Sequence, residues 1–383
     1  MNLLFLDQSG KLGGAELCLL DIANSYRKNC LVGLFEDGTF RTALEQQQIP
    51  VQVLATEPIA VRKETGFIKG LASLNQLLPL VIKVVQLSQG YDLIYANTQK
   101  ALVVGAIASF LSRRPLVYHL HDIISADHFS AANRRIIVAL ANRAALVIAN
   151  SQASQTAFIA AGGRADITTV VYNGFKPESY KYSAAERSQL RQQLGIDQQF
   201  VVGHFSRLSP WKGQHILLEA LARCPEHVMV ILVGDALFGE QAYVEQLHQQ
   251  IDRLGLQHRV RFLGFRSDVP QLMAACDLVA HTSTAPEPFG RVIVEAMLCG
   301  TPVVAAAAGG AMELVEPGKT GWLVPPGNPE KLATVIHQCD QQPEQAQKLA
   351  RQAKLQASQK FELSMINQQI AQSLHQVVNR AAI

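Results

Sequence analysis

Short apolar runs alternate with longer helical stretches along almost the whole chain. The runs that predict strands in the first half are residues 3–6, 31–35, 51–54, 93–96, 116–119 and 146–149. Those in the second half are residues 200–204, 228–233, 260–263, 278–281, 303–306 and 322–324. Runs this short and continuous are typical of strands buried on both faces of a parallel sheet. The pattern therefore predicts an α/β protein with two doubly wound, Rossmann-like halves.

The alternation stops near residues 170–175, and the chain is polar over 183–199 before it resumes. We therefore place a first domain over 1–175 and a second over 176–361. Apolar residues at helical spacing predict a final helix over about 362–383 that packs back on the first domain. Because ligands bind at the carboxyl ends of strands in open parallel sheets, we expect a site in a central cleft between the domains.

Composition narrows the class of protein. Of the 383 residues, 48% are hydrophobic and 17% are charged, which is typical of a globular protein. The formal net charge of +3 argues against nucleic acid as the main ligand. No two of the six cysteines form a C-x-x-C pair, so we expect buried reduced thiols. The N-terminus lacks the basic region of a signal peptide, and the sequence predicts a cytoplasmic protein.

Two carboxylates flank a predicted helix start in the second half. Glu287 precedes Pro288 and Gly290, which open the helix, and Glu295 lies on its second turn. A helix N-terminus suits phosphate or sugar oxygens, and both carboxylates could reach a polyhydroxylated ligand there. Taken alone, such a pair is more often a helix-start acid and a surface residue.

The loop after the first strand of the second half is basic. Arg207 and Lys212 stand five residues apart on it, and two such cations can flank a diphosphate. The alternative is an ordinary basic loop.

Two motifs of the first half follow predicted strands. The paired glycines Gly13 and Gly14 open the first helix, but they do not form the G-x-G-x-x-G pattern of nicotinamide cofactors. His119 and His121 end a strand and point to the same side, with His121 nearer the cleft. The sequence offers no third metal ligand at suitable spacing and no Asp-x-Asp triplet, so we predict neither a metal nor a cofactor.

Taken together, these segments resemble the retaining glycosyltransferases of family 4, which have the GT-B fold. The second half carries the resemblance through Arg207, Lys212-Gly213, the Glu287 and Glu295 pair and Gly309-Gly310. The first half adds Gly13-Gly14-Ala15-Glu16 and His121-Asp122.

The resemblance implies a metal-independent transfer of a hexosyl-type sugar from a nucleotide-diphospho-sugar to a carbohydrate or lipid-linked hydroxyl acceptor. Such a reaction serves polysaccharide, lipopolysaccharide or glycolipid synthesis. By resemblance, Arg207 and Lys212 bind the diphosphate, and Glu295 binds the ribose. Glu287 would hold the transferred sugar, helped by backbone groups near Phe289 and Gly290.

The remaining roles also come from the resemblance. Phe265 and Arg266 would border the base. Gly14 would let the diphosphate approach the first helix. His121 would touch the transferred sugar near the reacting carbon, although the neighbouring His119 leaves open which ring faces the donor. The alternative functions are a GT-B nucleotide-sugar epimerase and a non-catalytic module that binds sugar-nucleotide.

Residues 61–87 combine basic and apolar side chains, with four Lys or Arg against one acid. A basic amphipathic helix can lie on an anionic membrane, so this segment is a candidate for peripheral contact with the inner face of the membrane. A helix that packs on its own sheet would show the same pattern.

Overall fold

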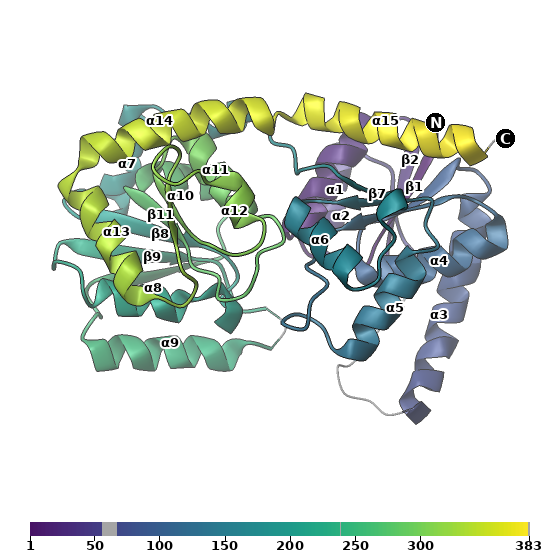
Figure 1. Ribbon diagram of the computed structural model, residues 1–383, viewed down its shortest axis with the longest axis horizontal. Helices are drawn as coiled ribbons and strands as arrows, with labels where there is room; N and C mark the ends of the chain where they lie inside the picture. The colour runs from purple at the N-terminus through teal and green to yellow at the C-terminus, as the bar shows by residue number, and fades with distance from the viewer. Residues whose placement is uncertain (56–66, 238, 382–383) are drawn as a thin grey trace. The chain divides into compact units, whose positions relative to one another are not determined.

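The computed structural model describes residues 1–55, 67–237 and 239–381, and the side chains of 67–76 lie outside that description. It forms two compact units (Figure 1). Unit 1 comprises Met1–Gly174 and Leu363–Ile383, and unit 2 comprises Phe175–Glu362. All six cysteines are free thiols, and five of them are buried.

Unit 1 is built on a seven-stranded parallel sheet in the order β3-β2-β1-β4-β5-β6-β7. Its strands are β1 Leu3–Asp7, β2 Cys30–Leu34, β3 Val51–Val53, β4 Leu93–Ala96, β5 Leu116–Leu120, β6 Leu146–Ala149 and β7 Thr168–Val170. Its helices are α1 Gly14–Ser25, α2 Thr39–Gln46, α3 Phe67–Ser88, α4 Gln99–Ser112, α5 Ala131–Ala141, α6 Gln152–Ala160 and α15 Leu363–Ala381.

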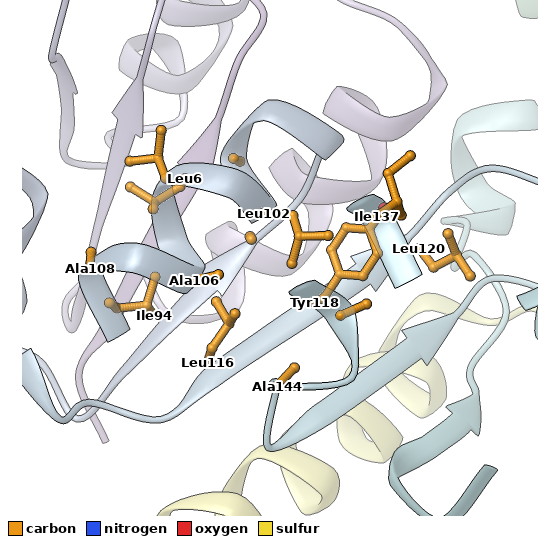
Figure 2. Packing of buried hydrophobic residues seen from close by; sticks show 14 of the residues in the cluster. Leu6, Ile94, Leu102, Ala106, Ala108, Leu116, Tyr118, Leu120, Ile137 and Ala144 are labelled. Carbon is orange, nitrogen blue, oxygen red and sulfur yellow. The ribbon is translucent and has the colours of Figure 1, made fainter. Parts of the chain in front are cut away.

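Each face of this sheet has its own core, because successive strand residues point to opposite faces. Leu4 and Leu6 of β1 pack in the cluster that includes α3, α4 and α5. Leu3 and Phe5 pack in the cluster that includes α1, α2 and α15. The first cluster surrounds the ring of Tyr118, which Figure 2 shows among Leu102, Leu120 and Ile137.

Unit 2 repeats the design with six parallel strands in the order β10-β9-β8-β11-β12-β13. The strands are β8 Phe200–Phe205, β9 Val228–Val233, β10 Val260–Gly264, β11 Leu278–His281, β12 Val303–Ala306 and β13 Trp322–Val324. The helices are α7 Ala184–Leu194, α8 Gln214–Leu221, α9 Gln241–Leu254, α10 Val269–Ala275, α11 Arg291–Cys299, α12 Ala311–Leu314, α13 Pro329–Gln341 and α14 Pro343–Lys360. Short 3-10 turns cover Ala165–Ile167 in unit 1, and Pro177–Tyr180 and Pro210–Lys212 in unit 2.

Local sequence sets the helix ends. The start of α7 is a capping box, in which the Ser183 hydroxyl accepts from Glu186 N and the Glu186 carboxylate accepts from Ser183 N. Helix α11 begins after Gly290 and ends at Gly300, and both glycines have left-handed backbone conformations.

One strand was missed by the sequence prediction, and the predicted final helix is present. Strand β7 was not predicted, because it has three half-buried residues at the sheet edge and no continuous apolar run. The final helix predicted over about 362–383 corresponds to α15, which follows α14 after a break at 361–362, where Phe361 O accepts from Phe175 N. Ile366, Ile370 and Leu374 of α15 lie in the core of unit 1.

The buried hydroxyl of Tyr118 provides a test of this packing. It has no hydrogen-bond partner among the described residues, and an unsatisfied buried hydroxyl costs about 1–3 kcal/mol. We expect Tyr118→Phe to keep or raise the free energy of unfolding in a urea titration. The matched control is Tyr95→Phe, which removes a 2.7 Å hydrogen bond to His119 Nδ1 and should destabilise the protein. A larger loss for Tyr118→Phe than for Tyr95→Phe would contradict the packing described.

Candidate functional site

The strand order of unit 2 reverses between β8 and β11, and the loops after these strands carry Arg207, Lys212 and Glu287. Such a reversal opens a crevice at the carboxyl edge of a parallel sheet. Lys212 lies on the loop after β8, and Glu287 lies on the loop after β11. The two loops approach each other closely at Gly213, where a Cβ would lie 2.0 Å from Thr282 O. Only glycine fits at this left-handed position.

One oxygen of Glu287 collects three hydrogen bonds. Its Oε2 accepts from Lys212 Nζ at 2.7 Å, from Ser283 Oγ at 3.0 Å and from His281 Nε2 at 3.1 Å. Burial raises the pKa of the Glu287 carboxyl, but the charge of Lys212 and the hydrogen bond from His281 outweigh burial and hold that pKa well below its usual range. Glu287 is therefore ionised.

The second oxygen of Glu287 is differently placed. Within the described part of the chain, Oε1 makes no hydrogen bond. An ionised carboxylate oxygen can only accept, so its natural partner is a donor such as a ligand hydroxyl. The protein thus fixes Glu287 through one oxygen and leaves the other for a ligand.

Lys212 is held from two sides. Its ammonium group contacts Glu287 and lies 3.9 Å from the centre of the Trp211 ring, a cation–π distance. The ammonium has three N–H donors, so it can bind an anion while it remains paired with Glu287. The sequence predicted its position, but not this ion pair.

The backbone of Glu287 is also anchored. Its carbonyl accepts from Gly310 N at 2.7 Å, and a Cβ at Gly309 would lie 2.3 Å from the same oxygen. Glycine after β12 is therefore required for this contact, in agreement with the small side chains that the sequence shows there.

Glu295 lies one helical turn along α11 and is paired with Arg291, at 3.4 Å from Nε to Oε1. Burial raises the pKa of Glu295, and Arg291 lowers it in part. Arg291 also lies over the ring of Phe175, at 4.6 Å.

Three other predicted residues of unit 2 lie on loops at strand ends. Arg207 is half-buried after β8, and its carbonyl accepts from Gln214 Nε2 at 2.8 Å. Phe265 and Arg266 follow β10. The ring of Phe265 is 70% exposed, whereas Arg266 is paired with Asp268 through two hydrogen bonds of 2.6 and 2.8 Å.

Phe289 and Gly290 precede α11. The Phe289 side chain is buried and stacks on Phe175, at 6.3 Å between ring centres. Gly290 is the residue before the first helical position, with φ of +100°.

In unit 1, Gly14 is exposed at the start of α1, and the two histidines lie at the end of β5. Their ring centres are 4.0 Å apart. His119 is buried and contacts Tyr95 OH, and burial lowers the pKa of His119 well below its usual value. His121 follows the strand and is half-buried, so its ring is the more accessible of the two.

Cys18 of α1 joins these histidines. Its Sγ and one nitrogen of each ring lie within 4.8 Å of one another, close enough for the three side chains to hold a metal ion. Sequence spacing did not reveal this third side chain, because it comes from a helix about 100 residues earlier that packs on the sheet. The predicted absence of a metal stays a prediction.

Sequence reasoning also missed His281 and Ser283 as partners of Glu287. His281 is the last residue of β11, and this position at the carboxyl end of a strand was the available signal.

Comparison with known proteins identifies the family. Residues 12–179 match the family described as Glycosyltransferase Family 4, and residues 186–356 match Glycosyl transferases group 1. The crystal structure of Anabaena HepE in complex with UDP-glucose is 66% identical, with a TM-score of 0.92, over 98% of this chain and 100% of that chain. The chain belongs to glycosyltransferase family 4. The family and the GT-B fold predicted from the sequence are thereby confirmed.

More distant members show the breadth of the family. The D-inositol 3-phosphate glycosyltransferase of Mycobacterium marinum is 33% identical over 261 residues, which are 64% of this chain and 55% of that protein. Spore coat protein SA of Bacillus subtilis is 31% identical over 210 residues, which are 51% of this chain and 55% of that protein. The chain thus spans about half the length of these curated relatives.

The ion pair of Glu287 predicts a pH dependence of stability. The native pKa of Glu287 lies below the 4.5 of an unperturbed Glu, so the unfolded chain binds more protons as the pH falls past that value. Stability from Glu287 is therefore present above pH 4.5 and is lost below it. From about pH 6 to about pH 3.5, we expect the wild type to lose about 1 kcal/mol more unfolding free energy than Glu287→Gln.

Urea titrations at several pH values measure this difference. Glu245→Gln, at an exposed position on α9, is the matched control and should follow the wild type. Parallel pH curves for Glu287→Gln and the wild type would show that Glu287 is not held as an ionised group.

Proposed function

We propose that the chain transfers a hexosyl group from a nucleotide-diphospho-sugar to a hydroxyl acceptor, with retention of configuration and without a metal. The observation that carries this proposal is the Lys212–Glu287 ion pair at the strand-order reversal of unit 2. It places a cation and a carboxylate oxygen side by side. The cation can bind the diphosphate of a diphospho-sugar, and the carboxylate oxygen can accept from a hydroxyl of its sugar.

In this proposal, Glu287 binds the transferred sugar. The low pKa keeps the carboxylate ionised, so Oε1 accepts a hydrogen bond from a sugar hydroxyl and does not act as an acid. Retaining hydrolases need a nucleophile and an acid about 5 Å apart. Glu287 is suited instead to holding the sugar while the acceptor reacts on the face from which the phosphate leaves.

Arg207 and Lys212 bind the diphosphate. As the sugar–phosphate bond breaks, negative charge grows on the leaving phosphate, and fixed cations stabilise that charge. The N-terminus of α11 adds its partial positive charge. These groups would do the work that a divalent cation does in metal-dependent enzymes.

The other roles follow the family resemblance. Glu295 binds the ribose hydroxyls, and Phe265 and Arg266 border the base. Backbone groups near Phe289 and Gly290 help to bind the sugar. In unit 1, Gly14 lies near the diphosphate and His121 contacts the transferred sugar.

The similarity to HepE, whose structure was determined with UDP-glucose and with UDP, supports a UDP-sugar as the donor. We propose UDP-glucose as the first donor to test. The acceptor would be a hydroxyl of a growing polysaccharide, lipopolysaccharide or glycolipid.

Lys212→Ala tests the assignment. We expect about 100-fold lower turnover of UDP-glucose, because one preorganised charge no longer stabilises the leaving phosphate. Product release is followed by chromatography, and NMR of the product reports the anomeric configuration. Lys319→Ala removes an exposed lysine that pairs with Glu316 and should leave turnover unchanged.

Other results would contradict the proposal. Normal turnover in Lys212→Ala would remove Lys212 from the site. Binding of UDP-glucose without transfer or hydrolysis would favour a non-catalytic module, and formation of an epimeric nucleotide-sugar would favour an epimerase.

We also propose that unit 1 contacts an anionic lipid surface near its acceptor. Residues 61–66 lie outside the described residues, but the described part of α3 and its neighbour α4 expose large apolar side chains, namely Leu78, Ile82, Ile107, Phe110 and Leu111. Arg113, which is exposed, and Arg114 follow α4 and supply positive charge. No helix among the described residues is long and apolar enough to cross a membrane.

Phe110→Ser combined with Leu111→Ser should abolish co-sedimentation with liposomes that contain anionic phospholipid. Phe110 is 77% exposed, so the change should not unfold the protein. Leu355→Ser, at an exposed position on α14, is the matched control. Co-sedimentation that survives the double change, or that occurs equally with neutral liposomes, would refute this surface.

A further inference from the structure

The strand order of unit 1 also reverses, between β1 and β4, and two buried polar residues mark that point. Asp7 is the last residue of β1, and Asn97 directly follows β4. Both are 0% exposed. Buried polar side chains are retained only where their hydrogen bonds are satisfied, so the partners of these two residues are informative.

The amide of Asn97 has a single consistent orientation. Its Nδ2 donates to Asp7 Oδ2 at 2.7 Å and to the carbonyl of Ala15 at 3.1 Å. A backbone carbonyl can only accept, so the amide nitrogen must face Ala15. This reasoning holds whether or not Asp7 is protonated, although burial raises the pKa of Asp7 to about 6.

The orientation of Asn97 decides the state of His121. With Nδ2 facing Ala15, the Oδ1 of Asn97 faces His121 Nε2 at 2.9 Å. An amide oxygen can only accept, so His121 Nε2 must donate and therefore carries the hydrogen. In the neutral ring, the lone pair is then on Nδ1.

Asp7 holds the far end of this chain of hydrogen bonds. Its Oδ2 accepts from Asn97, and its Oδ1 accepts from Ser9 N at 2.8 Å. The backbone N–H of Asn97 donates to Leu6 O at 3.0 Å. The amide is thus fixed by β1, by α1 and by its own backbone.

We propose that Asp7 and Asn97 are positioning residues that hold His121 in its Nε2–H tautomer, so that Nδ1 accepts a hydrogen bond from a substrate hydroxyl. The substrate part of this proposal rests on the proposed function. The tautomer part rests only on the contacts within unit 1. A neutral ring with this tautomer binds a hydroxyl as an acceptor and has no proton on Nδ1 to give to a leaving group.

The test is NMR of the full-length protein with ¹⁵N-labelled histidine, at about pH 8, where an ordinary histidine is neutral. The spectrum of His121→Gln identifies the His121 signals by their loss. We expect the wild type to show Nε2–H and an unprotonated Nδ1. A wild-type ring with hydrogen on Nδ1 would overturn the proposal before any Asn97 variant is needed.

Two variants at Asn97 sharpen the test. Asn97→Ala removes the acceptor, so the two ¹⁵N shifts of His121 should move toward each other as both tautomers become populated. Asn97→Asp keeps an oxygen beside Nε2 and should retain the Nε2–H tautomer. Asn142→Ala is the matched control, because Asn142 also joins two backbone groups of unit 1, Gly162 O and Arg164 N, and should leave the His121 shifts unchanged. Unchanged shifts in Asn97→Ala would overturn the proposal.

Kinetics separates this proposal from the proposed function. If Nδ1 binds a substrate hydroxyl, Asn97→Ala should lower kcat with UDP-glucose by about tenfold or more, through loss of orientation. Altered ¹⁵N shifts with unchanged kcat and KM would support the positioning network and overturn the role of His121 in the reaction. Altered shifts together with lower kcat would support both.

Discussion

The buried ion pair between Glu287 and Lys212 is the interaction on which the candidate site depends. A carboxylate that is almost removed from water stays ionised only if nearby charge and hydrogen bonds replace the lost hydration. Lys212, His281 and Ser283 supply these at one oxygen of Glu287. The same arrangement fixes the loop after β8 against the loop after β11, so the chemistry of the site and the local fold have one origin.

Each unit has a hydrogen-bonded polar pair at the point where its strand order reverses. In each sheet the strand order reverses beside the first strand, at β1 in unit 1 and at β8 in unit 2. Unit 2 places Glu287 and Lys212 at this position, and unit 1 places Asp7 and Asn97 there, with His121 at the end of the adjacent strand β5. The two sites differ in electrostatics. Unit 2 pairs a cation with a carboxylate, whereas unit 1 holds an imidazole against an amide oxygen.

Membership of glycosyltransferase family 4 connects these sites to sugar transfer. The 66% identity to HepE over nearly the full chain, with UDP-glucose bound to that protein, makes a nucleotide-sugar the natural ligand to consider. The exposed, apolar end of α4 is the surface at which we propose contact with an anionic lipid.

The sequence by itself determined the two parallel sheets, because continuous apolar runs such as 228–233 can be buried only between two layers of helices. It also determined that Arg207, Lys212 and Glu287 follow strands, because strand ends can be read from the pattern. It did not reveal β7, whose three half-buried residues carry no such run.

Only the tertiary structure decided which side chains meet. The hydrogen bonds of Lys212 with Glu287 and of Asn97 with Asp7, and the proximity of Cys18 to His119, involve residues 75 to about 100 positions apart. The physical reason is that periodicity records which face of an element is buried, whereas the partner of a buried polar group depends on strand order and on how closely two loops approach.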